Sequence, residues 1–274
     1  MEVFIVYGAH KTATTFFQKT LEINSQELLK NNVLFIPLEE LREKFTNTIF
    51  KEENWVRELK TKNFIKGIKD LNKIQRLIIF DENFCGPIFK GIKKEIYPEL
   101  NKNIYNINNY FSEFGIVKNI LIIRNYFDYF VSRYSEYLRQ YDVNISLEKY
   151  VNFEFDSSWF IYNKIDNYLI FEEIIKNNET FLDFLTGIKL DYNKLETDSY
   201  IFRRKYLFEE TQVLLNLSTL KYGKLRNHII DLFDGVDENN GTDIKEIYKD
   251  FYKSLSIKYE KDLKNSKKIL SLKK

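Results

Sequence analysis

A short N-terminal segment decides the fold, and it reads Val3-Phe4-Ile5-Val6-Tyr7-Gly8-Ala9-His10-Lys11-Thr12-Ala13-Thr14-Thr15-Phe16. Its apolar beginning, residues 3–6, predicts a buried strand, and the pattern after the threonines predicts a helix over about 13–23. A strand that turns tightly into a helix points free backbone N–H groups and the positive end of the helix dipole at one place. Lys11 adds a mobile positive charge, and Thr12, Thr14 and Thr15 add hydroxyl groups. The segment therefore predicts a binding site for a phosphate-like anion.

The composition indicates a folded protein of the cytoplasm. The chain has 274 residues, of which 44% are hydrophobic, and this length allows a substantial core. Its 42 basic and 40 acidic residues leave a formal charge of +2, so no global field favours nucleic acid as a partner. No apolar run approaches the roughly 18 residues of a transmembrane helix, and a strand that begins at Val3 leaves no room for a secretory signal. We therefore expect a cytoplasmic protein without a transmembrane segment.

Few residues suited to metal binding or disulfide formation are present. Cys85 is the only cysteine, which excludes an internal disulfide and a zinc site built from cysteines. The two histidines, His10 and His228, would need several carboxylates to complete a metal centre. We therefore expect no metal site, and we interpret Cys85 as a small packing group.

Strands and helices alternate along the rest of the chain. Apolar runs predict further strands at residues 33–36, 77–80, 119–123 and 168–171. Such continuous runs are typical of parallel strands that are covered on both faces. Residues 39–74 have a mostly helical pattern, and a long helix is expected near 243–263. This order predicts one α/β domain over residues 1–274, with a P-loop-like, three-layer fold in which helices flank a mostly parallel sheet.

Local patterns predict how two of the helices begin. Asn24 followed by Glu27 is typical of a capping box, and Asn125 is placed to cap the helix after the strand at 119–123. The residues of this last helix that form one apolar stripe are Phe127, Val131, Tyr134, Leu138 and Tyr141.

The N-terminal turn differs from the ordinary P-loop, which has a second glycine directly before its lysine. It resembles instead the 5′-phosphosulfate loop of sulfotransferases that use 3′-phosphoadenosine 5′-phosphosulfate (PAPS). Bacterial, carbohydrate-type members of that family often read H-K-T-G-T-T, and this chain departs only at Ala13, where glycine is usual. The residues that the resemblance assigns to cofactor binding are Gly8, Ala9, His10, Lys11, Thr12, Ala13, Thr14 and Thr15.

A second motif of the same family is an arginine that closes a strand, with a serine eight residues later. Arg124 and Ser132 have this spacing. A guanidinium offers a forked pair of donors to a phosphate, and a hydroxyl two turns along the helix adds another. The resemblance implies that these two residues bind the 3′-phosphate of PAPS. Both motifs follow predicted strands, so they can share one crevice at the carboxyl ends of the strands.

The resemblance implies a PAPS-dependent sulfotransferase that moves a sulfuryl group to a hydroxyl or amine of an acceptor, such as a carbohydrate or glycan precursor. The reaction is an in-line displacement that releases adenosine 3′,5′-bisphosphate (PAP) and needs no metal. Lys11 is expected to stabilise the charge on the leaving phosphate, and His10 to orient the loop or contact the sulfate. Glu82 follows the strand at 77–80 and is the candidate general base, with Asp81 as the alternative.

Two other functions fit the same pattern. An ATP-dependent phosphotransferase would need a magnesium site, for which Asp81 is the candidate ligand. A nucleotide-binding protein without turnover would keep the fold and the anion site. Finally, the basic run 264–274 is expected to be a solvated tail, with peripheral contact to an acidic membrane surface as the alternative.

Overall fold

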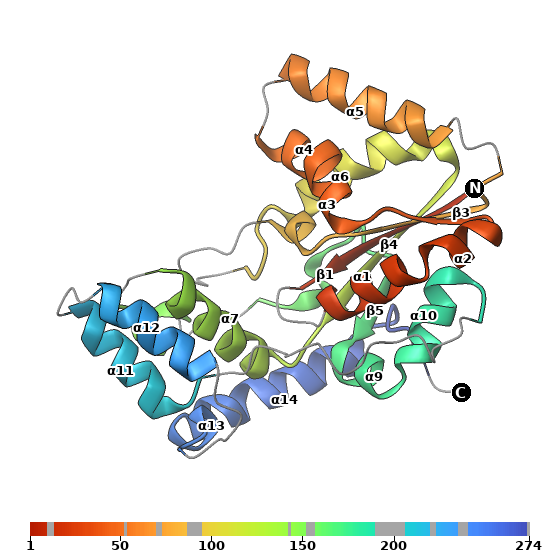
Figure 1. Cartoon of the computed structure of the whole chain (residues 1–274). Coiled ribbons are helices and arrows are strands. Elements are labelled where there is room, and N and C mark those ends of the chain that lie inside the picture. Colours follow the sequence, from red (N-terminus) through yellow and green to blue (C-terminus); the bar gives the residue numbers. More distant parts are fainter. Residues whose placement is uncertain are drawn as a thin grey trace.

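The computed structural model describes residues 1–9, 14–51, 54–69, 73–86, 95–141, 144–151, 157–189, 206–219, 223–234 and 241–272. Within this part of the chain, five parallel strands form one sheet in the order β2-β3-β1-β4-β5 (Figure 1). The strands are β1 (Glu2–Gly8), β2 (Val33–Phe35), β3 (Arg76–Phe80), β4 (Ile116–Ile123) and β5 (Asn167–Ile170). The predicted α/β class and parallel sheet are confirmed.

Helices cover both faces of the sheet, which makes the fold three-layered (Figure 1). The helices on one face are α1 (Thr14–Ile23), α2 (Ser25–Lys30), α9 (Phe171–Lys176) and α10 (Asn178–Thr186). The elements on the opposite face are α3 (Leu38–Leu41), the π-helix η1 (Arg42–Thr46), α4 (Asn47–Lys51), α5 (Asn54–Lys69), α6 (Leu100–Phe111) and the short 3₁₀-helix η3 (Ser112–Phe114). Alternate side chains of β1 point to opposite faces of the sheet. Phe4 and Val6 pack with Phe17 and Leu21 of α1, whereas Val3 and Ile5 pack in the core on the other face.

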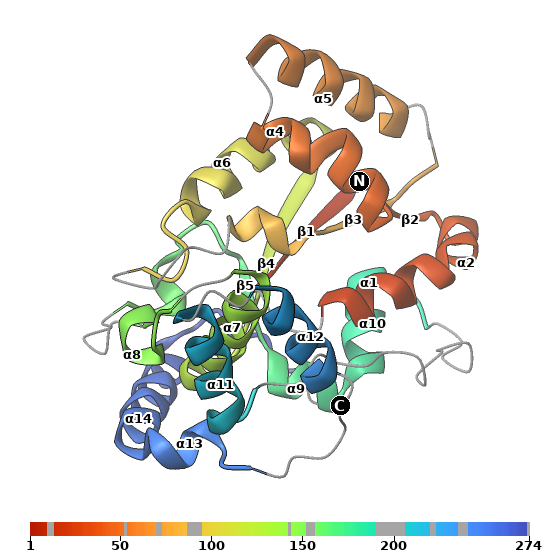
Figure 2. The ribbon, with the colours of Figure 1, turned by 60° about the vertical axis from the view of Figure 1, so that its left-hand side comes forward.

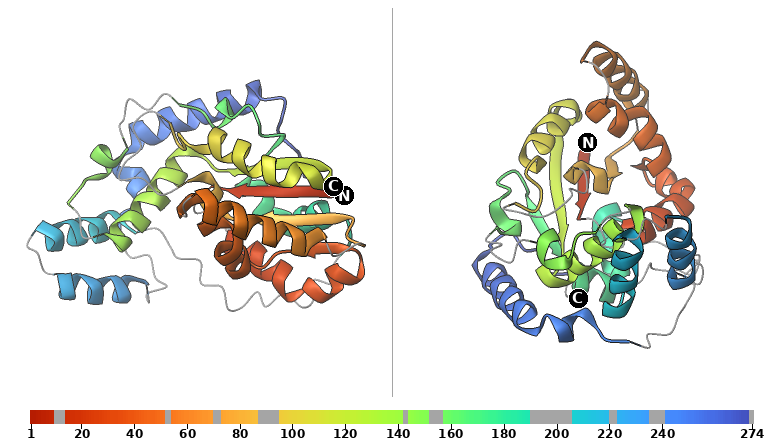
Figure 3. Two further views of the ribbon diagram at one scale, coloured as in Figure 1. Left: turned by 90° about the horizontal axis from the view of Figure 1, so that it is seen from above. Right: turned by 90° about the vertical axis from the view of Figure 1, so that its left-hand side faces the viewer.

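The remaining helices lie beyond the carboxyl ends of the strands. They are α7 (Tyr126–Gln140), α8 (Leu147–Tyr150), α11 (Phe208–Thr219), α12 (Gly223–Asp234), α13 (Ile244–Ile247) and α14 (Lys249–Asn265). Helix α7 continues from β4, and α8, α11 and α14 all pack on it (Figure 2). Seen from above, α11 and α12 stand farthest from the sheet (Figure 3). These helices therefore enclose the edge at which ligands of parallel sheets bind.

The five predicted strands are present, although their ends differ from the prediction by one to three residues. Strand β4 begins at Ile116 rather than at residue 119, because Val117 and Lys118 also pair with β1. The sequence obscures this extension, since Lys118 is polar and forms an ion pair with Glu2 at 2.5 Å. Strand β5 ends at Ile170, and α9 begins directly at Phe171.

Of the two predicted helix caps, the one at Asn125 is confirmed and the one at Asn24 is wrong. Asn125 caps α7 as expected, because its Oδ1 accepts from the amide of Phe127 at 3.0 Å. Asn24 precedes α2 but makes no side-chain cap. Its amide group instead donates to the carbonyl of Thr20, at the end of α1, at 2.8 Å. The capping box is therefore wrong, because the side chain ends the first helix instead of starting the second.

Helix α7 is buried on almost every side. The predicted stripe is confirmed from Phe127 to Leu138, but Tyr141 lies beyond the end of the helix and is 42% exposed. Polar residues of α7, including Ser132, Arg133 and Glu136, are buried as well. An amphipathic stripe underestimates this burial, because helices distant in sequence cover the polar side of α7.

In the C-terminal region the expected long helix is present with one break, whereas the expected solvated tail is wrong. The predicted helix near 243–263 is divided at Tyr248 into α13 and α14. The run after α14 is not a solvated tail over its described residues. Ile269 forms a parallel bridge with Tyr168 of β5, Leu272 is 4% exposed, and Lys268 donates to the carbonyls of residues 163 and 165. This segment thus pairs with β5 through one isolated bridge. No helix in the described ranges combines the length and apolar character needed to cross a membrane.

Candidate functional site

Three neighbouring strands bring the predicted site residues to one edge of the sheet. Gly8 ends β1, Glu82 follows β3, and Arg124 follows β4. Strand β1 lies between the other two, with Gly8 opposite Ile122 of β4 and Val6 opposite Phe80 of β3. The chain connects to one side of β1 through β2 and β3 and to the other through β4 and β5. This reversal of strand order is the usual position of a ligand in such sheets.

The turn after β1 is described at both of its ends. His10, Lys11, Thr12 and Ala13 lie outside the described residues, so their expected roles stay predictions. Ala9 is buried, and its amide donates to the carbonyl of Ile122 at 3.2 Å. Helix α1 begins at Thr14, and Thr15 is exposed on the same first turn.

Gly8 is required by the close approach of Thr14. A Cβ atom on Gly8 would lie 2.0 Å from Cγ2 of Thr14 and 3.3 Å from the ring of Phe80. A side chain at Gly8 would therefore displace the first turn of α1, whose backbone N–H groups supply the predicted anion site. The glycine thus sets the distance between the end of β1 and the start of α1.

Glu82 is connected directly to this turn. The hydroxyl of Thr14 donates to Oε2 of Glu82 at 2.7 Å, and Oε1 of Glu82 lies 3.6 Å from Nη2 of Arg42. The Glu82 side chain is 28% exposed. A carboxylate is thus placed beside the predicted anion site and remains open to solvent.

Asp81, the neighbour of Glu82, has a different environment. Its side chain is fully buried and lies 2.9 Å from Nη2 of Arg42. It also accepts from the hydroxyl of Thr46 at 2.8 Å and from the amide of Asn83 at 3.0 Å. Although burial lowers the pKa of Arg42, hydrogen bonds and charge from Asp81 and Glu82 raise it above its ordinary value. Asp81 therefore attaches the π-helix η1 to the end of β3, and its oxygens are already in use.

The side chains of Arg124 and Ser132, which were predicted to bind one phosphate, contact each other in the structure. Nη1 of Arg124 donates to the hydroxyl of Ser132 at 3.2 Å, and Ser132 is 7% exposed. The guanidinium lies over the ring of Phe171, 4.7 Å from its centroid, and its Nε is 3.9 Å from Glu172. Burial lowers the pKa of Arg124 and raises that of Glu172. The forked donors of Arg124 are thus held in one orientation at the end of β4.

Sequence reasoning missed the residues that hold this arginine and the start of α7. The indole of Trp159, in the 3₁₀-helix η4 (Trp159–Ile161), donates to the carbonyl of Arg124 at 2.8 Å. Its backbone amide donates to the hydroxyl of Tyr126 at 3.0 Å, and that hydroxyl donates to Asp262 of α14 at 2.6 Å. The abundance of aromatic residues was the only sequence signal, and it does not identify partners.

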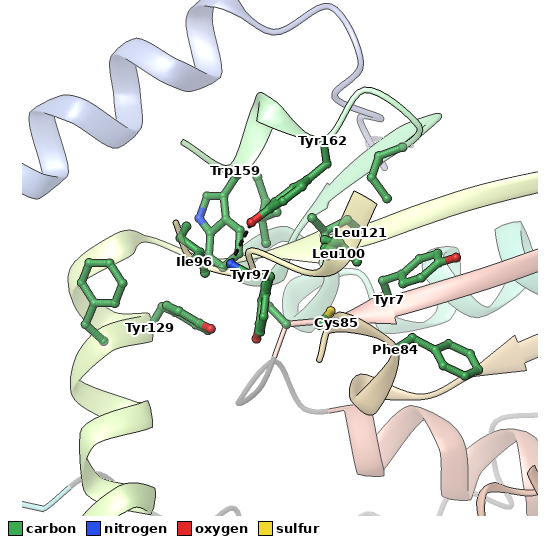
Figure 4. Packing of buried hydrophobic residues seen from close by; sticks show 14 of the residues in the cluster. Tyr7, Phe84, Cys85, Ile96, Tyr97, Leu100, Leu121, Tyr129, Trp159 and Tyr162 are labelled. Atoms are coloured by element: carbon green, nitrogen blue, oxygen red, sulfur yellow. Dashed lines mark hydrogen bonds between the residues drawn. The ribbon is translucent and has the colours of Figure 1, made fainter. Parts of the chain in front are cut away.

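Aromatic side chains fill the space between α7 and the 3₁₀-helix η2 (Glu82–Cys85). Tyr97 lies between Tyr129 of α7 and Cys85 of η2 (Figure 4). Cys85 is fully buried, with Sγ 3.6 Å from the carbonyl of Gly8. Burial raises the pKa of its thiol well above the ordinary value. Cys85 is therefore a neutral packing group, as its sequence context predicted.

The described part of the site thus contains a strand–helix turn, a partly exposed carboxylate bonded to that turn, and an arginine–serine pair that follows the adjacent strand. Such a set fits a ligand with two separate anionic groups. No known family model matches the chain, and no curated protein sequence matches it.

Proposed function

We propose that the protein is a PAPS-dependent sulfotransferase that transfers a sulfuryl group to a hydroxyl or amine of an acceptor, in particular a carbohydrate or glycan precursor. One observation carries the proposal. The Arg124–Ser132 pair and the Gly8–Thr14 turn, which are far apart in sequence, lie at the carboxyl ends of two hydrogen-bonded strands. PAPS has anionic groups at both ends of its ribose, so one donor molecule can engage both motifs.

In this reaction an acceptor oxygen or nitrogen forms a bond to sulfur while the bond from sulfur to the leaving phosphate oxygen breaks. PAP leaves, and the acceptor loses its proton. The turn amides, Lys11 and Thr14 would face the phosphosulfate, and Lys11 would stabilise the negative charge that develops on the leaving oxygen. Arg124 and Ser132 would bind the 3′-phosphate.

Glu82 is the better candidate for the base that takes the acceptor proton. Its carboxylate touches Thr14 beside the proposed phosphosulfate site and is 28% exposed. Asp81 is fully buried and accepts from Arg42, Thr46 and Asn83. A base must reach the proton that it removes, and only Glu82 of this pair is open to an acceptor.

The environment of Asp81 also bears on the rival function. An ATP-dependent phosphotransferase would use Asp81 as its magnesium ligand, but a metal there would first have to displace the Arg42 guanidinium, 2.9 Å away. This favours the sulfotransferase. A binding protein without turnover would share the same geometry, so only an assay of transfer separates it from an enzyme.

The test is sulfuryl transfer from ³⁵S-labelled PAPS to a panel of glycan acceptors, with a parallel assay of phosphoryl transfer from γ-³²P-labelled ATP and Mg²⁺. We expect labelled product only from PAPS. Lys118→Ala, at the opposite edge of the sheet, is the matched control for Lys11→Ala and should retain transfer. Phosphoryl transfer without sulfuryl transfer would contradict the proposal.

A further inference from the structure

An arginine of α7, Arg133, is buried without an acidic partner in the described part of the chain. It is 0% exposed. Its Nη1 donates to the hydroxyl of Tyr129 at 2.8 Å, and its Cζ lies 5.4 Å from the ring centroid of Tyr129 and 5.6 Å from that of Tyr97. Its Nε and Nη2 are buried and make no hydrogen bond. Burial of a charge is unfavourable unless the charge is paired, so this guanidinium needs an explanation.

The groups around Arg133 do not supply a negative charge. The two acidic residues of α7 are engaged elsewhere, because Asp128 pairs with Lys245 and Glu136 with Arg139. The nearby hydroxyls and thiol belong to Tyr97, Tyr129, Tyr150 and Cys85, and burial raises the pKa of each, so all four stay neutral. Contacts with aromatic rings stabilise the cation in part, but they leave its hydrogen-bonding edge unused.

That unused edge has a specific geometry. Nε and Nη2 carry parallel N–H bonds on one side of the guanidinium, and this side binds a carboxylate or a phosphate through two hydrogen bonds. The hydroxyl of Tyr150 is likewise buried, and it lies beside the Arg133 guanidinium without a hydrogen bond of normal geometry. Unsatisfied buried donors of this kind are rare in native proteins and indicate a missing partner.

Arg133 faces a different part of the site from its neighbour Ser132. Ser132 bonds to Arg124, whereas Arg133 contacts Tyr97, which lies next to Cys85 (Figure 4). Cys85 is the last residue of η2, and Glu82 is the first. Arg133 is thus directed toward the short helix that carries the candidate base, and away from the proposed 3′-phosphate site.

We propose that Arg133 and Tyr150 form a subsite for an oxyanion group of the acceptor, such as a carboxylate, sulfate or phosphate. The acceptor is then an acidic molecule, whose anionic group binds Arg133 while its hydroxyl or amine faces Glu82. This inference rests on the proposed function, because it assigns the subsite to an acceptor. The rival explanation is a purely structural arginine held by tyrosine rings.

The experiment uses the full chain, saturated with PAP, and titrates it calorimetrically with inorganic sulfate against chloride at equal ionic strength. We expect sulfate to bind the wild-type protein and Lys11→Ala, and Arg133→Met to lose at least about tenfold in affinity. Arg133→Lys keeps the positive charge but loses the paired N–H donors of the guanidinium. Its affinity for sulfate should therefore lie between those of the wild type and Arg133→Met. Absence of sulfate binding, or binding that depends on Lys11 and not on Arg133, would overturn the subsite.

Thermal unfolding separates this explanation from a structural role. Without anion, Arg133→Met should unfold at the same or a higher temperature than the wild type, because it removes an unpaired buried charge. A large decrease in the unfolding temperature of Arg133→Met would indicate a structural arginine and would contradict the proposal.

The acceptor assignment is tested with matched pairs of glycan acceptors, each with its acidic groups present or removed, for example by carboxyl reduction. The wild type should prefer the acidic member by about tenfold or more in kcat/KM, and Arg133→Met should lose this preference. Equal use of both members by the wild type would refute the acidic acceptor. Failure of PAP to bind would instead refute the proposed function, and the sulfate titration can be repeated without nucleotide to judge the subsite by itself.

Discussion

The amino and carboxyl edges of the sheet both carry charged side chains. The charges at the amino edge are paired with one another, whereas several buried polar atoms near the carboxyl edge have no hydrogen-bond partner among the described residues. At the amino edge, Glu2 pairs with Arg76 at 2.6 Å and with Lys118 at 2.5 Å, and Arg76 also donates to the carbonyl of Leu185. At the carboxyl edge, Arg133 has two buried nitrogens without hydrogen bonds, and Oε2 of Glu172, which lies beside Arg124, is also buried without one.

This difference indicates where function is located. Charges that neutralise one another contribute to the fold alone, whereas buried donors left without partners in the protein are available to a ligand. The comparison can be tested residue by residue, because the amino edge also carries a glutamate, a lysine and an arginine, namely Glu2, Lys118 and Arg76.

The largest contrast is expected between two glutamates. Glu82→Gln should lower the rate of sulfuryl transfer by about 10²–10⁴-fold, because it removes the proposed general base. Glu2→Gln, the same change at the amino edge, should leave the transfer rate unaltered. Single-turnover transfer from ³⁵S-labelled PAPS measures both, and full activity of Glu82→Gln would disprove its role as base.

A similar contrast is expected between two lysines. Lys11→Ala should lower kcat by about 10²–10³-fold, as does loss of a donor to a developing oxyanion. Lys118→Ala should keep its kcat, since Lys118 pairs with Glu2. Circular dichroism checks that both variants are folded, and equal losses of kcat in the two would remove the distinction between the edges.

Asp81 lies at the carboxyl edge, but its carboxylate is ion-paired and hydrogen-bonded within the protein, like the charged groups of the amino edge. Asp81→Asn should lower the free energy of unfolding by about 2–4 kcal/mol, the lower part of the range for breaking a buried ion pair, since Arg42 stays partly exposed. Glu82→Gln should change it much less. Urea unfolding gives both values, and the reverse order would show that the roles of the two carboxylates are exchanged.

The smallest effect concerns pH and the amino edge. Hydrogen bonds from Lys118 and Arg76 lower the pKa of Glu2. Because the folded pKa lies below the unfolded one, this stabilisation is present above the unfolded pKa and is lost as the pH falls through the folded pKa. The stability difference between the wild type and Glu2→Gln should therefore shrink between neutral pH and pH values below about 4. A difference that does not change with pH would mean that the ion pairs contribute nothing.

The sequence was sufficient for the features that depend on local pattern. Apolar runs identified the cores of all five strands, and the positions of Gly8, Glu82 and Arg124 just after three of them predicted that these residues share one edge. The Arg124–Ser132 pair was predicted from its spacing on a strand–helix junction, and the structure joins the two side chains at 3.2 Å.

The features that the sequence did not reveal depend on contacts between distant segments. Arg42 and Thr46 bind Asp81 from a π-helix, and no periodic pattern identifies a helical residue whose partner follows a later strand. Arg133 occupies a position of α7 that an amphipathic reading leaves in solvent, and it is buried only because other helices cover α7. The same reason explains the C-terminal run, where the basic residues concealed the pairing of Ile269 with Tyr168.

Calorimetric titration with PAP tests the central claim most directly. We expect the wild-type protein to bind PAP in preference to ATP with Mg²⁺, and Arg124→Ala to weaken PAP binding by about 10- to 100-fold, as loss of a charge-assisted hydrogen bond to phosphate implies. Arg76→Ala, at the amino edge, should bind PAP like the wild type. Binding of ATP with Mg²⁺ but not of PAP, or equal weakening of PAP binding by the two arginine variants, would contradict the account.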